Sequence, residues 1–172
     1  MASSLPTGMR RLAALGTLAA VAALACAGLL ERDPAGKARR QLAAGQPALA
    51  ADSIEQAVQQ RPRDVALRVE AAVIQRAADH TERAVLHLEV AQSIQPEDPE
   101  ISILLGDIEQ SRGNATDAYV AFRRAVSLAP DDVRAVSGLA LAADALGFDE
   151  EAVRHYERWA ELEAAAAARR SQ

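Results

Sequence analysis

Few side chains in this 172-residue chain have the chemistry needed for catalysis or metal binding. The candidates are one thiol, Cys26, and three imidazoles, His80, His87 and His155. A zinc hydrolase would place its ligands as His-Glu-x-x-His, and a phosphate-binding loop would be rich in glycine. The sequence has neither pattern, nor a nucleophile with an evident partner base. It therefore predicts no catalytic, cofactor-binding or metal-ligating residue.

The histidines and the acidic runs have structural explanations instead. His87 and His155 are separated by two 34-residue intervals and are expected to be solvated on outward-facing helix surfaces, while His80 falls in a turn. The acidic residues at 97–100 and 149–151 precede predicted helices, where negative charge offsets the helix dipole. None of these groups points to paired-carboxylate chemistry.

Charge excludes one large class of partner. The net charge is −5, and residues 99–163 hold thirteen acidic and six basic side chains. Binding to phosphate backbones requires a basic surface. Nucleic acid is therefore not an expected partner.

The N-terminal segment 1–30 is predicted to direct the chain to a membrane. Residues 12–30 are uncharged and follow Arg10 and Arg11. A run of this length is a candidate transmembrane helix, although its many alanines make it weakly apolar. Three alternatives remain open. The segment is an uncleaved anchor helix, a signal peptide cleaved after the small-x-small run 23–25, or a lipoprotein signal with Cys26 as the lipidated residue.

The rest of the chain could lie on either side of the membrane, and both alternatives remain open. Export to the periplasm is the simplest outcome of an N-terminal signal of this kind. However, the basic residues Arg32, Lys37, Arg39 and Arg40 follow the apolar run, and the positive-inside rule would keep an uncleaved form on the cytoplasmic face. We expect an extracytoplasmic location, with the cytoplasmic face of the inner membrane as the alternative.

The remainder of the chain is predicted to be all-helical. Half of the residues are apolar, yet only 3% are aromatic, and alanine supplies much of the apolar content. Alanine has the highest helix propensity, whereas strands favour β-branched and aromatic residues.

A 34-residue period organises these helices. Pro62, Pro96 and Pro130 are 34 residues apart and define four units: 31–64, 65–98, 99–132 and 133–166, followed by a tail at 167–172. Counting from the first residue of each unit, position 20 is always alanine and position 24 is a large apolar or aromatic residue. Such a period indicates a repeat architecture in which stacked units bury one continuous core. The residues at positions 20 and 24 are Ala50, Ala84, Ala118, Ala152 and Ile54, Leu88, Phe122, Tyr156.

Local signals place two helices in each unit. First helices are expected after Asp64, after Asp98 with Pro99 at the first helical position, and after Asp131 or Asp132. Second helices are expected from Pro47, near Thr81, near Thr116 and after Asp149. Gly113 and Gly147 are expected to end the preceding helices, because glycine accepts the left-handed conformation found there.

This pattern resembles the tetratricopeptide repeat family, with Gly106, Ala118, Phe122, Ala125 and Pro130 of the third unit in the family positions. The resemblance implies a right-handed α-solenoid of four helix-turn-helix repeats after the N-terminal hydrophobic helix. It also implies a non-enzymatic scaffold that binds a partner protein or peptide in a concave groove lined by the first helices. Carried over by register, the groove residues are Arg39, Val69, Val73, Arg76, Ile103, Asp107, Gln110, Ser137, Leu141 and Asp144.

Four of these residues, Val69, Val73, Ile103 and Leu141, form a predicted apolar stripe suited to an amphipathic helix or an extended peptide. The alternative is that neighbouring helices bury them. Trp159 replaces the alanine of position 27 in the last unit, which predicts the end of the array there. A second functional hypothesis is therefore a structural or regulatory subunit of a larger membrane assembly, held through this C-terminal edge. A homodimer is a further, less favoured option.

Overall fold

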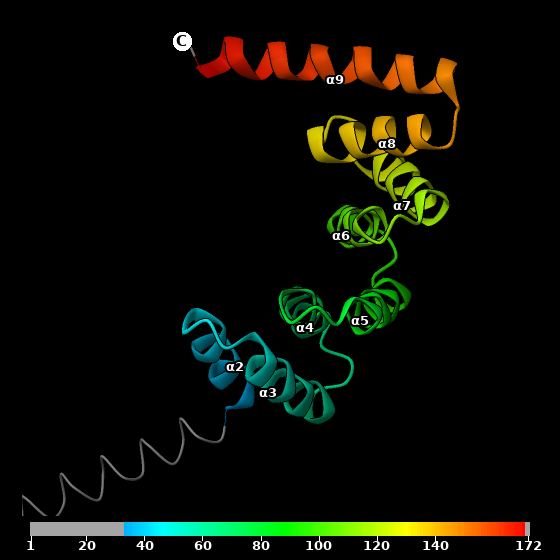
Figure 1. The fold of residues 1–172 in the computed structure, drawn as a ribbon. Helices are drawn as coiled ribbons and strands as arrows, with labels where there is room; N and C mark the ends of the chain where they lie inside the picture. Colours follow the sequence, from blue (N-terminus) through cyan, green and yellow to red (C-terminus); the bar gives the residue numbers. More distant parts are fainter. Residues whose placement is uncertain (1–32, 171–172) are drawn as a thin grey trace, which may run out of the picture.

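The computed structural model describes residues 33–170 as eight α-helices joined by short turns, with no strand in that range. Figure 1 shows the helices as successive antiparallel pairs along a curved array. Cys26 and the predicted N-terminal hydrophobic helix lie outside the described residues. Within residues 33–170, no helix has both the length and the apolar character that a membrane crossing requires. The helices are α2 Pro34–Ala43, α3 Pro47–Gln60, α4 Val65–Ala77, α5 Thr81–Ile94, α6 Pro99–Ser111, α7 Ala115–Leu128, α8 Val133–Ala145 and α9 Asp149–Arg170.

Three aspartates begin the first helices of the later pairs. The side chain of Asp64 accepts a hydrogen bond from the backbone N–H of Leu67 at 3.0 Å, and Asp98 accepts one from Glu100 at 2.9 Å. Of the two candidates at the start of α8, Asp132 is the cap, whereas Asp131 pairs with Arg158 on α9. These bonds satisfy N–H groups that have no partner inside the helix.

The turn inside each pair uses the same backbone conformation. Gly45, Asp79, Gly113 and Gly147 all occupy repeat position 15, and all have positive φ, between 63° and 78°. The expected helix ends at Gly113 and Gly147 are confirmed. Asp79 shows that this position tolerates a short polar residue in place of glycine, as left-handed backbone generally does.

The core lies between the two helices of each pair and between successive pairs. The position-20 alanines of the first three units have no exposed surface, and Ile54, Leu88 and Phe122 at position 24 are equally buried. Phe122 of α7 packs between Gly106 of α6 and Gly138 of α8, where there is no room for a side chain. Small residues thus let neighbouring helices approach, while one large residue per unit fills the space between them.

The array has two faces. Helices α2, α4, α6 and α8 lie on the inner side of the curve in Figure 1, and α3, α5 and α7 lie on its outer side. We call the solvent-exposed sides of these two sets the inner face and the outer face. The last helix, α9, runs past the end of α8 as far as Arg170.

Candidate partner-binding surfaces

Repeat position 9 provides the exposed apolar residues of the predicted groove. Its four members are Arg39, Val73, Asp107 and Leu141, one from each first helix. Val73 is 40% exposed and Leu141 is 42% exposed, which is unusual for apolar residues at the centre of a helix. Arg39 is also exposed, whereas Asp107 is partly buried. The inner face therefore alternates charged and apolar side chains along the array.

The predicted apolar stripe is shorter than the sequence indicated, because Ile103 is fully buried. Ile103 belongs to the core cluster around Phe122 and Leu139, so its assignment to the groove surface is wrong. Val69, at the same repeat position, is partly buried against the preceding core cluster. Position 5 faces the neighbouring first helix and position 9 faces solvent, which leaves Val73 and Leu141 as the exposed apolar pair.

Ion pairs connect adjacent first helices on the inner face. Arg39 of α2 donates to Glu70 of α4, with Nη2 to Oε2 at 2.7 Å. Arg134 of α8 donates through Nη1 to Glu100 Oε1 of α6 at 3.0 Å. The hydrogen bond from Arg134 lowers the pKa of Glu100, and the hydrogen bond to Glu70 raises the pKa of Arg39. The charges of these four residues are thus neutralised locally, in pairs.

Asp107 occupies the middle of the inner face. Burial raises the pKa of the Asp107 carboxyl, and the positive charges of Arg76 and Arg134 oppose that shift. Desolvation disfavours the charged form of a carboxyl, so an ionised Asp107 is held at some cost. A basic group on a bound partner would reduce this cost.

The remaining predicted groove residues lie at the margins of the inner face. Gln110 is exposed near the end of α6, and the hydroxyl of Ser137 donates to the backbone oxygen of Arg134 at 3.2 Å. Asp144 accepts a hydrogen bond from the Tyr156 hydroxyl at 3.2 Å, and burial is the main cause of a raised pKa at Tyr156. All of the predicted residues lie on the first helices α2, α4, α6 and α8, and Ile103 among them is fully buried.

His87 is not a solvated surface residue, which corrects our expectation. It is only 7% exposed, and its Nε2 lies 2.9 Å from Glu55 Oε1 on the neighbouring helix α3. Repeat position 23 faces the preceding second helix, so a histidine there is covered when that helix carries a carboxylate. His155, at the same position in the last unit, is more exposed and lies 3.6 Å from Glu151 within α9.

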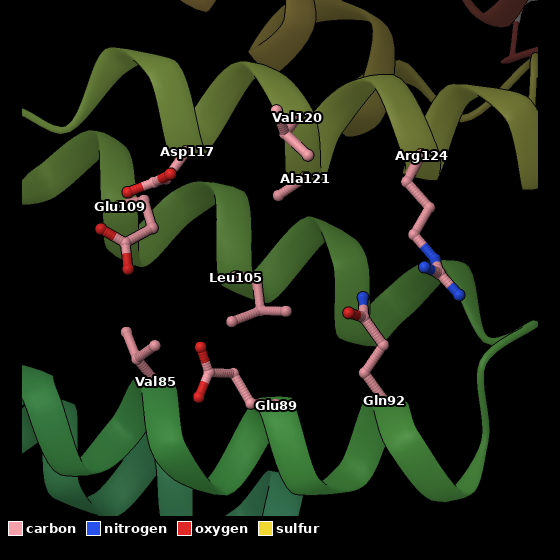
Figure 2. Close-up of a pocket in the computed structure, with 9 residues that line it drawn as sticks. All are labelled: Val85, Glu89, Gln92, Leu105, Glu109, Asp117, Val120, Ala121 and Arg124. Carbon is pink, nitrogen blue, oxygen red and sulfur yellow. The ribbon is translucent and has the colours of Figure 1, made fainter.

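A second hollow, which the sequence analysis missed, opens on the outer face. It has a volume of about 300 Å³ and lies between α5 and α7, with α6 behind it (Figure 2). We call it the outer-face pocket. Leu105 of α6 lies at its back, with Asp117 and Glu109 on one side and Arg124 and Gln92 on the other. Its lining residues are Val85, Glu89, Gln92, Leu105, Glu109, Asp117, Val120, Ala121 and Arg124. The sequence signal was repeat position 23, which is histidine in units two and four but Ala121 in unit three.

The four pairs at a 34-residue spacing, with small residues at the helix contacts, define an α-solenoid of the tetratricopeptide type. Residues 41–108 match the family model described as Tetratricopeptide repeat. That match covers less than half of the chain, and it supports the resemblance to this family.

Solved structures of MamA share the fold. One crystal structure of MamA superposes with a TM-score of 0.73 at 20% identity, covering 96% of this chain and 99% of that one. Another has a TM-score of 0.70 at 21% identity, covering 81% and 79%. A MamA structure from Desulfovibrio magneticus RS-1 has a TM-score of 0.67 at 18% identity, covering 74% and 72%. A comparison with curated proteins gives no significant match. At these identities the likeness establishes the fold alone.

Proposed function

We propose that this chain is a non-enzymatic protein–protein interaction scaffold that binds a peptide segment of a partner along its inner face. The observation that carries the proposal is the exposure of Val73 and Leu141 at the same repeat position on α4 and α8. Both are apolar where the other two units carry Arg39 and Asp107. A solenoid supplies a rigid, extended surface for such contacts.

The two exposed side chains define what the partner must present. Covering the exposed parts of one valine and one leucine would contribute roughly 1–2 kcal/mol. A helix or extended segment with two apolar residues would make these contacts, and a basic residue between them would face the partly buried carboxyl of Asp107. The paired charges beside them, such as Arg134 with Glu100, would set the orientation of the partner more than its affinity.

A pull-down of full-length protein from detergent-solubilised membranes, analysed by mass spectrometry, tests the inner face. The informative variant carries Val73→Arg and Leu141→Arg together. The matched control carries Leu49→Arg and Leu86→Arg, two outer-face residues that are 51% and 59% exposed. We expect the partner to be lost with the first variant and retained with the control, at unchanged helicity by circular dichroism. Retention by both variants would refute binding through the inner face.

We further propose that the scaffold works in a bacterial cell envelope, with its repeats extracytoplasmic. This part of the proposal comes from the uncharged run at 12–30 and the preceding Arg10 and Arg11. Fusing alkaline phosphatase or a cytoplasm-only fluorescent protein to the C-terminus would report the location, because each reporter is active on one side of the membrane. Phosphatase activity is the expected result, and fluorescence alone would place the repeats on the cytoplasmic face.

A second candidate function, a structural or regulatory subunit of a larger membrane assembly, is favoured by the C-terminal edge. The Trp159 ring lies beside the Tyr156 ring with centroids 6.4 Å apart. Its indole Nε1 is buried without a hydrogen-bond partner in the part of the chain that the structure describes. Trp159→Ala should abolish assembly through this edge, whereas Val73→Arg should not. The opposite pattern would assign assembly to the inner face.

A further inference from the structure

The contact of α3 with α5 and the contact of α5 with α7 occupy equivalent places in the repeat. They carry different side chains around a glutamate that both contacts share. At the first contact, Glu55 receives a hydrogen bond from Gln75 Nε2 at 2.7 Å and is 2.9 Å from His87 Nε2. An ionised carboxylate only accepts hydrogen bonds, so the imidazole donates here. Gln75 and His87 are both buried, and the carboxylate therefore finds its partners inside the chain.

At the second contact, both donors are missing. Glu89 is 34 residues after Glu55 and takes its place in the repeat. The residue equivalent to Gln75 is Glu109, and the residue equivalent to His87 is Ala121. A carboxylate has therefore replaced an amide donor, and a methyl group has replaced an imidazole. Glu89 has lost both groups that satisfy its counterpart.

No other residue in the described part of the chain supplies the donors that Gln75 and His87 provide to Glu55. The carboxylate of Glu109 already accepts from Arg112 at 3.0 Å and from Asn114 at 2.7 Å. Arg124, the one cation lining the pocket, donates to the backbone oxygen of Pro96 at 2.8 Å. Among the described residues, none makes a hydrogen bond or ion pair with the carboxylate of Glu89 or of Asp117, and both of these side chains are exposed to solvent.

The two contacts also differ in how far the hollow beside them reaches toward the first helix behind it. The outer-face pocket extends down to Leu105 and Glu109 of α6 (Figure 2). The corresponding hollow between α3 and α5 is lined by residues of those two helices alone, His87 among them, and none from α4. The outer-face pocket thus combines an apolar back and walls with carboxylates at its mouth.

We propose that the outer-face pocket binds an arginine side chain presented by a partner protein. The positive guanidinium would supply, in place of water, the N–H donors that the chain itself does not give Glu89, and would also face Asp117 on the opposite helix. Its forked donors suit two carboxylates, and its aliphatic stem would pack against Leu105 and Val120. This surface is on the face opposite to Val73 and Leu141, so the inference stands independently of the function proposed for the inner face.

A pair of synthetic peptides tests the charge requirement. Full-length ¹⁵N-labelled protein in detergent micelles would be titrated with acetyl-Leu-Arg-Leu-amide and with the same peptide carrying citrulline, a neutral isostere of arginine. We expect saturable amide shifts at Glu89, Asp117 and Ala121, with the citrulline peptide about tenfold weaker. Equal binding of the two peptides, or no shift at these residues, would overturn the proposal.

Three variants test the location. Ala121→His restores the residue found in units two and four and should abolish the shifts, because the hollow that is lined by His87 does not reach the first helix behind it. Glu89→Gln should weaken arginine binding about tenfold, whereas Glu55→Gln, at the same repeat position, should leave it unchanged. An unaltered amide spectrum elsewhere verifies the fold of each variant. Arginine binding that survives in Ala121→His would place the peptide at another site.

Sedimentation of the wild type and of Ala121→His shows whether the pocket binds a different protein or a second copy of this chain. The proposal expects the two proteins to sediment alike. If the wild type self-associates and the variant does not, the occupant of the pocket is another copy of the chain, and the assignment to a different partner is wrong.

Discussion

A Cβ atom built on Gly138 of α8 would lie 2.4 Å from the ring carbon Cε1 of Phe122 on α7. Real side chains do not approach so closely, and the ring is fully buried, so it has little room to move. This contact joins the third helical pair to the fourth. It shows that a glycine inside α8 is required by packing, although glycine lowers helix propensity there.

Gly138→Ala should therefore destabilise the chain. Overpacking costs about 1–3 kcal/mol, and better helix propensity returns up to about 1 kcal/mol, so a net loss is expected. Urea unfolding monitored by circular dichroism measures it. In a Phe122→Leu background the same substitution should become neutral or stabilising, because the smaller side chain relieves the clash. A stabilising effect in the wild-type background would contradict this reading of the contact.

The neighbouring aspartates before α8 should differ sharply on substitution. Asp132 accepts from the N–H groups of Arg134 at 2.9 Å and Ala135 at 3.3 Å, so Asp132→Ala should cost about 1 kcal/mol of unfolding free energy. Asp131 makes only an exposed pair with Arg158, and Asp131→Ala should change stability by less than about 0.5 kcal/mol. Equal losses in denaturant titrations would show that the cap is not the stabilising feature.

His87→Ala should cost about 2 kcal/mol, because it leaves a cavity and removes a donor from Glu55. His155→Ala is the matched control at the same repeat position. The loss there should be below about 1 kcal/mol, since the His155 side chain is 23% exposed and pairs only within its own helix. Thermal or urea unfolding compares the two, and an equal cost would mean that burial of His87 contributes nothing.

Asp107→Asn should raise stability at neutral pH relative to the wild type. Burial raises the pKa of Asp107 in the folded chain, so the folded state holds this proton more tightly than the unfolded state does. The ionised form is thus penalised at neutral pH, and the penalty disappears once both states are protonated. The advantage of the variant should shrink as pH falls toward the ordinary aspartate value of 3.8.

Glu100→Gln should show the opposite pH dependence, which makes it the control for Asp107→Asn. The pKa of Glu100 is lowered by the hydrogen bond from Arg134, so its ionised form stabilises the fold above the ordinary value of 4.5. This variant should be the less stable protein at neutral pH, with the difference lost as pH falls. Urea titrations between pH 4 and 7.5 measure both variants, and the same trend in both would show that burial is not what distinguishes Asp107.

Repeat length, helix starts and internal turns of this protein were predictable from the sequence. Asp64, Asp98 and Asp132 act on N–H groups two or three residues away, and Gly113 and Gly147 act on their own backbone. Such effects span only a few residues, so their physical cause is contained in the local sequence. The large core residue at position 24 could be predicted as well, because every unit has a large apolar or aromatic residue there.

Only the tertiary structure decided which of these repeated positions reach solvent. Val73 and Ile103 are both apolar residues of first helices, yet one is exposed and the other is enclosed beside Phe122. His87 is covered because Glu55, 32 residues earlier in the chain, lies opposite it. The pocket at Ala121 reaches Leu105 and Glu109 of α6, whereas the hollow beside His87 reaches no residue of α4. Exposure and pairing depend on side chains about one repeat away, whose contacts are set by how successive pairs stack. A short sequence pattern does not contain that geometry.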